Sequence, residues 1–446
     1  MGGSLSQKKG KFEILVKTGD VKGSGTDSNV FCRLIDGEGN SSPVLPLDCM
    51  FRNDFENGNL DSFKISNVHN VGTVQHIQLW RDSRGMKDDW FVEVIKVRKI
   101  GKAGEGNREW KPFPINRWIE SDKEYTFALY DSILPQCDKH PDQRERELVE
   151  KRSTYSFEDA ITGIPRKIKE CPKSEKFSTD YQWDIIGRQV KYLAQKKLQT
   201  IFNKGKWNSL EDLLDVYKGT FGIPRGYYDW RSDQMFGQQR LTGCNPTLIK
   251  RCQSIPTNFA VCSDMVEPFL DDDMTLEDAM KKKLIYMVDL GVLEGIHCKD
   301  DHVLCCPFAL FYRKTEGPLV PIAIQLFQQP SEDNPVFLPN DPEYTWMLAK
   351  MFYNNADCAH HQACSHLGFT HFLCESICVS VHQSLSPSHP VFRLLAPHFL
   401  YLIAINDLAV TRLLAEDGWV DRTMTMGTCG LLEIVQRMWK SWKVSD

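Results

Sequence analysis

The pattern of apolar and polar residues divides the chain into two regions with different periodicities. Between residues 11 and 100, apolar and polar positions alternate in four short segments, FEILVKT, VFCRLID, VQHIQLW and WFVEVIKV, which are separated by turns rich in Gly, Asp and Asn. Short alternating segments at this spacing predict the strands of a β-sandwich. A stretch rich in Gly and Pro, 101–118, then leads to a short predicted strand at 124–129.

Beyond residue 140 the apolar residues recur every three to four positions, which predicts amphipathic helices. The segments are DQRERELVEKR, DIIGRQVKYLAQKKLQTIF and NSLEDLLDVYKGTF, and Asn208 and Ser209 are candidate N-caps of the third. ALFYRKT and PLVPIAIQLF predict a β-hairpin among these helices. We therefore predict a multidomain chain, with an all-β sandwich at residues 1–117 and a mainly α-helical domain at residues 118–446.

Composition and charge narrow the class of protein. The 446 residues carry a net charge of −5 without a long basic block, which argues against binding to nucleic acid. The longest apolar run, 399–405, is far shorter than the roughly 20 residues that span a bilayer, and the N-terminus lacks the apolar core of a secretory signal. Fifteen cysteines without such a signal predict reduced thiols in a soluble, cytoplasmic protein.

The N-terminus carries a possible lipid-attachment motif. MGGSLS fits the pattern M-G-x-x-x-[ST], in which Gly2 accepts a myristoyl group, and Lys8, Lys9 and Lys11 follow as a basic second signal. An unmodified tail is the alternative.

Seven of the 12 histidines lie between His360 and His398, and this region is a candidate metal site. His361, His366 and His371 repeat every five residues in a segment that is predicted to be helical. In a regular α-helix, residues five apart point about 140° away from each other and cannot share an ion. A π-bulge, with i→i+5 hydrogen bonds, would bring two of them onto one face. Histidines of the core or the surface are the alternative.

Two further groups of residues have ligand chemistry. His297, Cys298, His302, Cys305 and Cys306 match no zinc-finger or zinc-ribbon spacing, so a structural zinc site there is not favoured. Acidic and amide side chains in the predicted sandwich loops offer the hard oxygen ligands that Ca²⁺ prefers, although such residues also simply form turns. The calcium candidates are Asp27, Asn53, Asp54, Glu56, Asp88 and Asp89.

Several long motifs together resemble one family. PVFLPNDPEYTWMLAKMFYNNADCAHHQACSHLGFTHFLCES and HPVFRLLAPHFLYLIAINDLA resemble the iron-binding helix and the following helix of animal lipoxygenases. KTGDVKGSGTDSNVF, FRNDFENG and IQLWRD resemble the PLAT domain, a C2-like sandwich. MFGQQRLTGCNPTLIKRC, MVDLGVLEGI and VPIAIQLFQ resemble the arachidonate 5-lipoxygenase and coral allene oxide synthase-lipoxygenase type. The resemblance covers nearly the whole chain.

The resemblance implies a non-haem iron site and its chemistry. The first two iron ligands of the family fall on His366 and His371, whereas His361 matches a histidine that is not a ligand. In the family, a ferric hydroxide takes hydrogen from a bis-allylic carbon of a polyunsaturated fatty acid, and O₂ then adds to give a hydroperoxide. Gln362 and Glu375 are candidates for hydrogen bonding around the ligands, with helix-surface polarity as the alternative. Residues matching the substrate pocket are Leu367, Ile405, Ala409 and Leu413.

For the sandwich, the resemblance implies Ca²⁺-dependent, reversible association with a membrane surface. In relatives, Ca²⁺ helps the loops to press apolar residues into the membrane interface. Trp80 and Met86 are the candidates for that contact here, and either could instead belong to the core.

The chain also departs from the family. Lipoxygenases continue through a third iron histidine, a nearby Asn or His and a C-terminal Ile, and no matching segments precede the final KSWKVSD. We therefore expect a C-terminally truncated lipoxygenase that binds iron weakly and has little or no activity. The alternatives are a Ca²⁺-dependent lipid- or membrane-binding fragment without catalysis, and a hydroperoxide isomerase.

Overall fold

The computed structural model describes residues 10–49, 52–69, 71–84, 90–101, 109–138, 140–158, 164–177, 181, 184–188, 209–217, 222–271, 273–299 and 302–442. The chain divides into two compact units. The first comprises Met1–Glu158, Lys167–Gly187 and Cys374–Ile405, and the second comprises Asp159–Arg166, Arg188–Leu373 and Asn406–Asp446. Candidate residues that lie outside the described ranges are Gly2, Lys8, Lys9, Met86, Asp88, Asp89 and Asn208.

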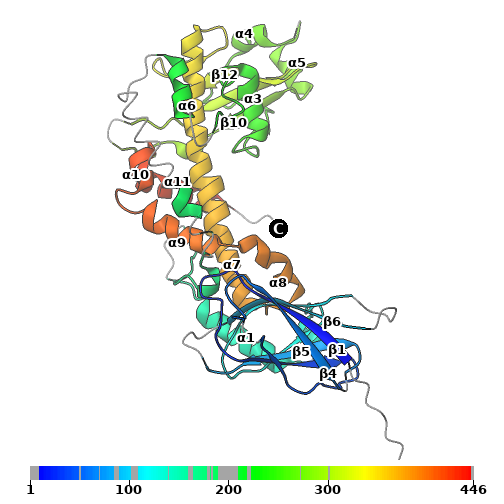
Figure 1. Cartoon of the computed structure of the whole chain (residues 1–446). Coiled ribbons are helices and arrows are strands. Elements are labelled where there is room, and N and C mark those ends of the chain that lie inside the picture. The colour runs from blue at the N-terminus through cyan, green and yellow to red at the C-terminus, as the bar shows by residue number, and fades with distance from the viewer. Residues whose placement is uncertain are drawn as a thin grey trace, which may run out of the picture. The chain divides into compact units, whose positions relative to one another are not determined.

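The first unit contains a β-sandwich, drawn in blue to cyan in Figure 1. Within the described ranges, eight strands form two four-stranded antiparallel sheets, with orders β4-β1-β6-β7 and β3-β2-β5-β8. The strands are β1 (Gly10–Thr18), β2 (Val30–Asp36), β3 (Leu45–Leu47), β4 (Leu60–Val68), β5 (Val74–Arg81), β6 (Trp90–Lys99), β7 (Lys111–Ile119) and β8 (Tyr125–Ala128). The four segments predicted from alternation correspond to β1, β2, β5 and β6, the short strand predicted at 124–129 corresponds to β8, and the predicted sandwich is confirmed.

The two sheets bury their inward-facing residues against each other. Along β2, for example, every second residue from Val30 is buried, as the pleat of a strand requires. Trp90 is fully buried and its indole nitrogen donates to Thr18 Oγ1 at 3.1 Å, which satisfies its single polar atom. The predicted boundary between residues 117 and 118 falls inside strand β7, and strand β8 of the sandwich lies after it. The division into domains at this position stays a prediction.

Strand β7 lies at the edge of its sheet and contains Pro112 and Pro114. Proline has no amide hydrogen, so within sheets it is confined mostly to edge strands and bulges. The register of β7 against β6 shifts between Val92 and Val94, which marks a bulge or irregularity beside Pro114.

Helices of the first unit surround a second, smaller core. They are η1 (Pro135–Cys137), α1 (Pro141–Thr154), η2 (Lys173–Glu175), α7 (Cys374–Ser384), α8 (Pro390–Leu395), η7 (Ala396–Phe399) and the start of α9 (Leu402–Arg412). Tyr155, Cys378, Val379 and Phe392 are among its buried residues. The helix predicted at DQRERELVEKR is α1, so that prediction is confirmed.

A buried ionic network ties β7 and α1 to α8 within this unit. The Asp131 side chain has 0% exposure and lies among three guanidinium groups. Its Oδ2 is 3.2 Å from Arg117 Nη1 and 3.1 Å from Arg393 Nη2, and its Oδ1 is 3.1 Å from Arg144 Nη2. The Ser388 hydroxyl donates to Oδ2 at 2.6 Å. Glu147 also pairs with Arg117 and Arg144, and Asp138 pairs with Arg144, so Asp131 is the carboxylate that all three guanidinium groups share.

Among the residues that the structure describes, one segment, Pro390–Arg412, is long and apolar enough to cross a membrane by length and composition. Its helical course is interrupted, because the 3₁₀ turn η7 follows α8 and Tyr401 then takes a φ of 61° before α9. A membrane-spanning helix requires about 20 continuous helical residues. The segment as folded here does not provide them.

The second unit combines a small sheet with helices. Its strands are β9 (Lys250–Arg251), β10 (Ile285–Asp289), β11 (Phe308–Arg313), β12 (Leu319–Gln325) and β13 (Val336–Phe337), in the order β13-β12-β11-β10-β9. Strands β11 and β12 form the predicted hairpin. The helices are η3 (Leu210–Val216), α3 (Asp233–Thr242), α4 (Ser263–Val266), η4 (Glu267–Phe269), α5 (Leu276–Lys281), η5 (Gly291–Leu293), α6 (Glu343–His360), a π-helix (His361–Leu373), α10 (Trp419–Thr423) and α11 (Gly427–Ser441). The α-helix expected at NSLEDLLDVYKGTF is instead the 3₁₀ helix η3, with Ser209 as its N-cap.

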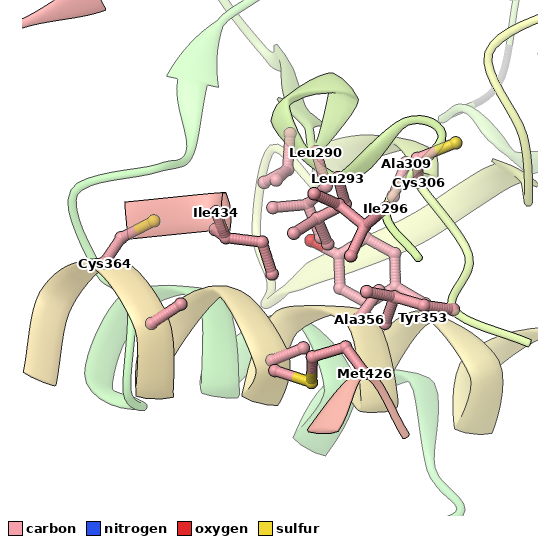
Figure 2. Close-up of a cluster of buried hydrophobic side chains, with 14 of the residues drawn as sticks. Leu290, Leu293, Ile296, Cys306, Ala309, Tyr353, Ala356, Cys364, Met426 and Ile434 are labelled. Carbon is pink, nitrogen blue, oxygen red and sulfur yellow. The ribbon is translucent and has the colours of Figure 1, made fainter. Parts of the chain in front are cut away.

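The main core of the second unit lies along α6 and the π-helix (Figure 2). Tyr353, Ala356 and Cys364 from this helical run face Leu293 and Ile434, which come from η5 and α11. Helix α11 also approaches the π-helix closely, since a Cβ on Gly368 would lie only 2.6 Å from Met438 Cε. The π-helix is therefore held by packing on one side, and its orientation does not depend on its own hydrogen bonds alone.

Candidate metal centre

The three histidines of the five-residue repeat lie in the π-helix His361–Leu373, which continues directly from α6. In a π-helix the backbone hydrogen bonds run i→i+5, so residues five apart return close to the same face. The spacing alone left histidines of the core or the surface as the alternative, and the structure has the π geometry that the family resemblance implied for this repeat. Helices of this kind are rare and occur frequently at functional sites.

His366 and His371 form a close pair. Their Nε2 atoms lie 2.9 Å apart, and the planes of the two rings are inclined at 76°. His366 is exposed and His371 is half-buried. The pair is therefore accessible from solution.

The outer nitrogen of each ring has its own acceptor. His366 Nδ1 lies 2.9 Å from Gln362 Oε1, and His371 Nδ1 lies 2.6 Å from Asn406 Oδ1. Asn406 Nδ2 donates to the His371 carbonyl at 3.1 Å, which orients the amide so that its oxygen faces the ring. An imidazole whose Nδ1 faces an acceptor carries its hydrogen there when neutral, so its Nε2 presents a lone pair.

Two lone pairs that point at each other across 2.9 Å repel unless a cation lies beside both. Metal–imidazole bonds are about 2.0–2.1 Å long, so two such nitrogens at a right angle around one ion would be about 3 Å apart. Neutral imidazoles also suit first-row transition metals, including iron. Desolvation by the surrounding side chains, together with the nearby His371 and His361 rings, lowers the pKa of His366, which favours its neutral, ligating form. The pair fits a metal ion.

Other side chains add little to the donor set. Over the described part of the chain, no group of three or more His, Cys, Asp or Glu side chains is arranged to hold a metal ion. The His361 ring stacks on His366 with a centroid distance of 5.9 Å and an angle of 6°, so the nitrogens of these parallel rings do not converge. Among the His and Cys residues between His297 and Cys306, which were weighed above as a zinc site, His302 has its Nδ1 atom 2.9 Å from the Lys299 carbonyl oxygen.

The remaining candidate residues occupy varied positions. Glu375 lies in the first unit, where its carboxylate accepts a hydrogen bond from the Ile168 amide at 2.8 Å. Leu367 is buried in the main core of the second unit, Ala409 is half-buried and Leu413 is exposed. Ile405 is a half-buried residue of the first unit. Their roles in a substrate pocket stay predictions.

Asn406 is a site residue that sequence reasoning did not single out. It is 4% exposed and follows the apolar run FLYLIAI. A buried amide needs a hydrogen-bond partner, and here the His371 ring and carbonyl provide it. Its partner is 35 residues away along the chain.

Three of the calcium candidates meet in one cleft. Asp27, Asn53 and Asp54 line a cleft of about 260 Å³ between the loops of the sandwich. Asp27 and Glu56 are exposed, and Asn53 donates to the Glu56 carboxylate. Asp54 is already engaged, because its oxygens accept from the Cys49 amide at 2.7 Å and from Arg52 Nε at 2.6 Å.

Trp80, the candidate for membrane contact, lies on the outer side of the same sandwich. It is half-buried and stacks on Phe31, which lines the cleft, with ring centroids 5.9 Å apart. An aromatic pair therefore lies beside the acidic loops.

Comparison with known proteins is consistent over both regions. The family model described as lipoxygenase matches residues 194–446, and the model described as PLAT/LH2 domain matches residues 12–130. A mouse (Mus musculus) polyunsaturated fatty acid lipoxygenase, ALOX8, is 30% identical over 96% of this chain and 65% of its own length. The allene oxide synthase-lipoxygenase protein of the coral Plexaura homomalla is also 30% identical, over 98% of this chain and 43% of its own length.

Solved structures agree with these relatives. A calcium-dependent 11R-lipoxygenase superposes with a TM-score of 0.81 at 33% identity, over 97% of this chain and 66% of its own. Coral 8R-lipoxygenase, described with calcium activation through a C2-like domain, gives a TM-score of 0.80 at 31% identity, over 96% and 65%. The chain thus spans about 65% of the length of ALOX8 and of coral 8R-lipoxygenase.

Proposed function

Because this chain belongs to the lipoxygenase family, we propose that His366 and His371 hold a non-haem iron ion that serves the oxygenation of polyunsaturated fatty acids. The family and its PLAT domain, inferred above from sequence motifs, are confirmed by the matches to residues 194–446 and 12–130. The observation that supports the iron site is the 2.9 Å approach of two Nε2 atoms whose opposite nitrogens both face amide oxygens.

Within this proposal the residues of the chain bind and orient. When bound, iron supplies the one-electron oxidation that removes a hydrogen atom from a bis-allylic carbon before O₂ adds to the substrate. Gln362 and Asn406 hold the two imidazoles in the tautomer that leaves Nε2 free and fix the planes of the rings. Ala409, which is half-buried, and Leu413, which is exposed, would offer apolar surface to a hydrocarbon chain, while Leu367 packs in the core beneath.

Anaerobic titration with Fe²⁺, followed by calorimetry, tests the iron site. We expect one saturable site of low affinity, because two imidazoles from one helix, one of them exposed, leave several positions of the ion open to water. After desalting, the chain should retain well below one iron per molecule and form little hydroperoxide from arachidonate. Retention of near one iron would contradict weak binding, and no heat of binding at millimolar Fe²⁺ would contradict the site itself.

Product analysis separates the two reactions that the family resemblance leaves open. Formation of a hydroperoxide from a fatty acid and O₂ is expected for the oxygenase. Consumption of an added fatty acid hydroperoxide without uptake of O₂ would favour the isomerase.

We also propose that the sandwich binds membranes in a Ca²⁺-dependent way, which would make the chain a cytoplasmic protein that associates with membranes reversibly. The supporting observation is the cleft that gathers Asp27, Asn53 and Asp54 beside the Phe31–Trp80 pair. Oxygen ligands from adjacent loops are the coordination that Ca²⁺ prefers.

Pelleting with anionic liposomes, with and without Ca²⁺, tests this second proposal. We expect Ca²⁺ to raise the bound fraction several-fold, and Asp27→Asn to remove most of that increase because an exposed ligand is lost. Glu145→Gln is the matched control, since it removes one negative charge from an exposed position on α1 away from the cleft. Equal pelleting with Ca²⁺ and with a chelator would contradict the proposal.

A further inference from the structure

The loop that follows α3 contains a buried amide, Asn245, whose three hydrogen bonds all go to α6 and the π-helix. Asn245 is 5% exposed. Its Nδ2 donates to the Asp357 carbonyl at 2.8 Å and to Asp357 Oδ1 at 2.9 Å. Its Oδ1 accepts from the Ser365 hydroxyl at 2.8 Å. One side chain thus connects two points that are eight residues apart on the helix.

The first of these points is the junction between the α- and π-helical segments. The His361 amide, at the first residue of the π-helix, donates to the carbonyls of Asp357 and Cys358. Asn245 adds a further donor to the Asp357 carbonyl, one turn before that residue. Arg240 supports Asp357 from its other oxygen, with Nη1 3.3 Å from Oδ2.

The second point lies next to the proposed metal ligands. Ser365 precedes His366, and Thr370 precedes His371. The Thr370 hydroxyl donates to the Ser365 carbonyl at 2.9 Å, so the two polar residues are paired across the same five-residue interval as the two histidines. A shift of the helix at Ser365 would therefore alter the relative placement of both imidazoles.

We propose that Asn245 is a positioning residue of the metal centre, which sets the π register of residues 361–373 and thereby holds His366 Nε2 beside His371 Nε2. This inference rests on the proposed function, since it gives a role to the same histidine pair. A π-helix competes with the more stable α-helical pattern. In an α-helix, residues five apart diverge by about 140°. The amide of Asn245 favours the π arrangement because it binds the Asp357 carbonyl and the Ser365 hydroxyl together in that arrangement.

Asn245→Asp tests this role with little change in size. The substitution replaces the Nδ2 donor by an oxygen that faces the carbonyl and the carboxylate of Asp357. We expect the affinity for Co²⁺, used as a spectroscopic probe of the histidine pair, to fall by about 10–100-fold, the usual effect of losing a residue that orients metal ligands. In the metal-free chain, we expect faster hydrogen exchange at the amides of 361–373.

Asn334→Asp is the matched control. Asn334 is also buried in the second unit, and its Nδ2 likewise donates to two acceptors, the carbonyls of Phe327 and Gln329, at 2.8 Å each. Because these contacts lie in the loop after β12, the control should lose stability without losing Co²⁺ affinity or protection of the π-helix. Ser365→Ala removes a single bond to Asn245 and should give a loss between those of the wild type and Asn245→Asp.

The outcomes separate this inference from the iron proposal. Equal Co²⁺ affinity and equal exchange at 361–373 in Asn245→Asp and Asn334→Asp would overturn the role of Asn245. If Asn245→Asp does not fold, unchanged affinity and exchange in Ser365→Ala would overturn it as well. If the wild type binds neither Co²⁺ nor Fe²⁺ but Asn245→Asp still selectively exposes the π-helix, the register role stands and the iron proposal fails.

Discussion

Asp131→Asn is expected to lower the free energy of unfolding of the first unit by about 3–5 kcal/mol, the usual effect of removing one partner from a buried ion pair. The Asp131 carboxylate is fully buried and lies within 3.2 Å of Arg117, Arg144 and Arg393. The neutral amide of the substituted side chain would leave the charges of the three guanidinium groups partly uncompensated. Its NH₂ group would also lie beside their N–H groups, which are donors as well. Urea denaturation followed by circular dichroism measures the effect.

Asp36→Asn is the control for losing a buried carboxylate that has no arginine beside it. Asp36 is also buried in the first unit and accepts hydrogen bonds from the amides of Glu38, Asn40 and Gly72. Its replacement should cost much less than that of Asp131, because hydrogen bonds and no ion pair are lost. Similar losses for the two variants would show that the arginine network does not depend on the charge of Asp131.

The same network predicts a dependence on pH. Burial alone would raise the pKa of Asp131, but Arg117 and Arg144 outweigh it and hold the pKa below its usual value. Because the pKa is lower in the folded than in the unfolded state, the stabilisation is present above about pH 4 and is lost as the pH falls through the folded pKa. The wild type should therefore lose more stability than Asp131→Asn on acidification, and parallel profiles would contradict this assignment.

His366→Ala and His371→Ala are each expected to reduce metal affinity by more than about 100-fold, beyond the range typical for residues that only orient ligands. Each substitution removes one of the two Nε2 atoms that lie 2.9 Å apart. Titration with Co²⁺ or anaerobic Fe²⁺ gives the affinity, and circular dichroism verifies that the variants fold.

His361→Ala is the matched control, because it removes an imidazole from the same π-helix and the same five-residue repeat. His361 stacks parallel to His366, so it contributes packing rather than a convergent nitrogen. We expect its loss to change the affinity by only a few-fold. A loss as large as that of His371→Ala would show that the metal is bound by a different pair.

The strands that escaped prediction all lie at sheet edges. β1, β2, β5 and β6 are central strands, and their regular alternation reflects burial between neighbours on both sides. β3, β4 and β7 are edge strands and were missed, whereas the edge strand β8 was predicted. β7 begins KPFP and β4 includes the polar residues Asp61, Ser62 and Lys64, so neither shows the alternation expected of a strand between two others.

Only the part of the site whose residues are close together in the sequence, the histidine repeat, was predicted. The five-residue histidine interval is inconsistent with a shared face on an α-helix, which raised the π geometry as one interpretation, and the family resemblance then favoured it. Asn406 and Asn245 act on this helix from 35 and 120 residues away along the chain. Contacts of that separation arise from tertiary packing, so no periodicity in the sequence could indicate them.

The two prolines of β7 have a consequence for the behaviour of the chain in concentrated solution. An edge strand exposes a row of free amides and carbonyls along which a strand of another molecule can add. Pro112 and Pro114 supply no amide hydrogen, and their carbonyls already accept from the Tyr130 amide at 3.0 Å and from Arg393 Nη2 at 2.7 Å. Sheet-to-sheet polymerisation should therefore be disfavoured at this edge, and replacing both prolines by threonine would be expected to make the protein more prone to self-association.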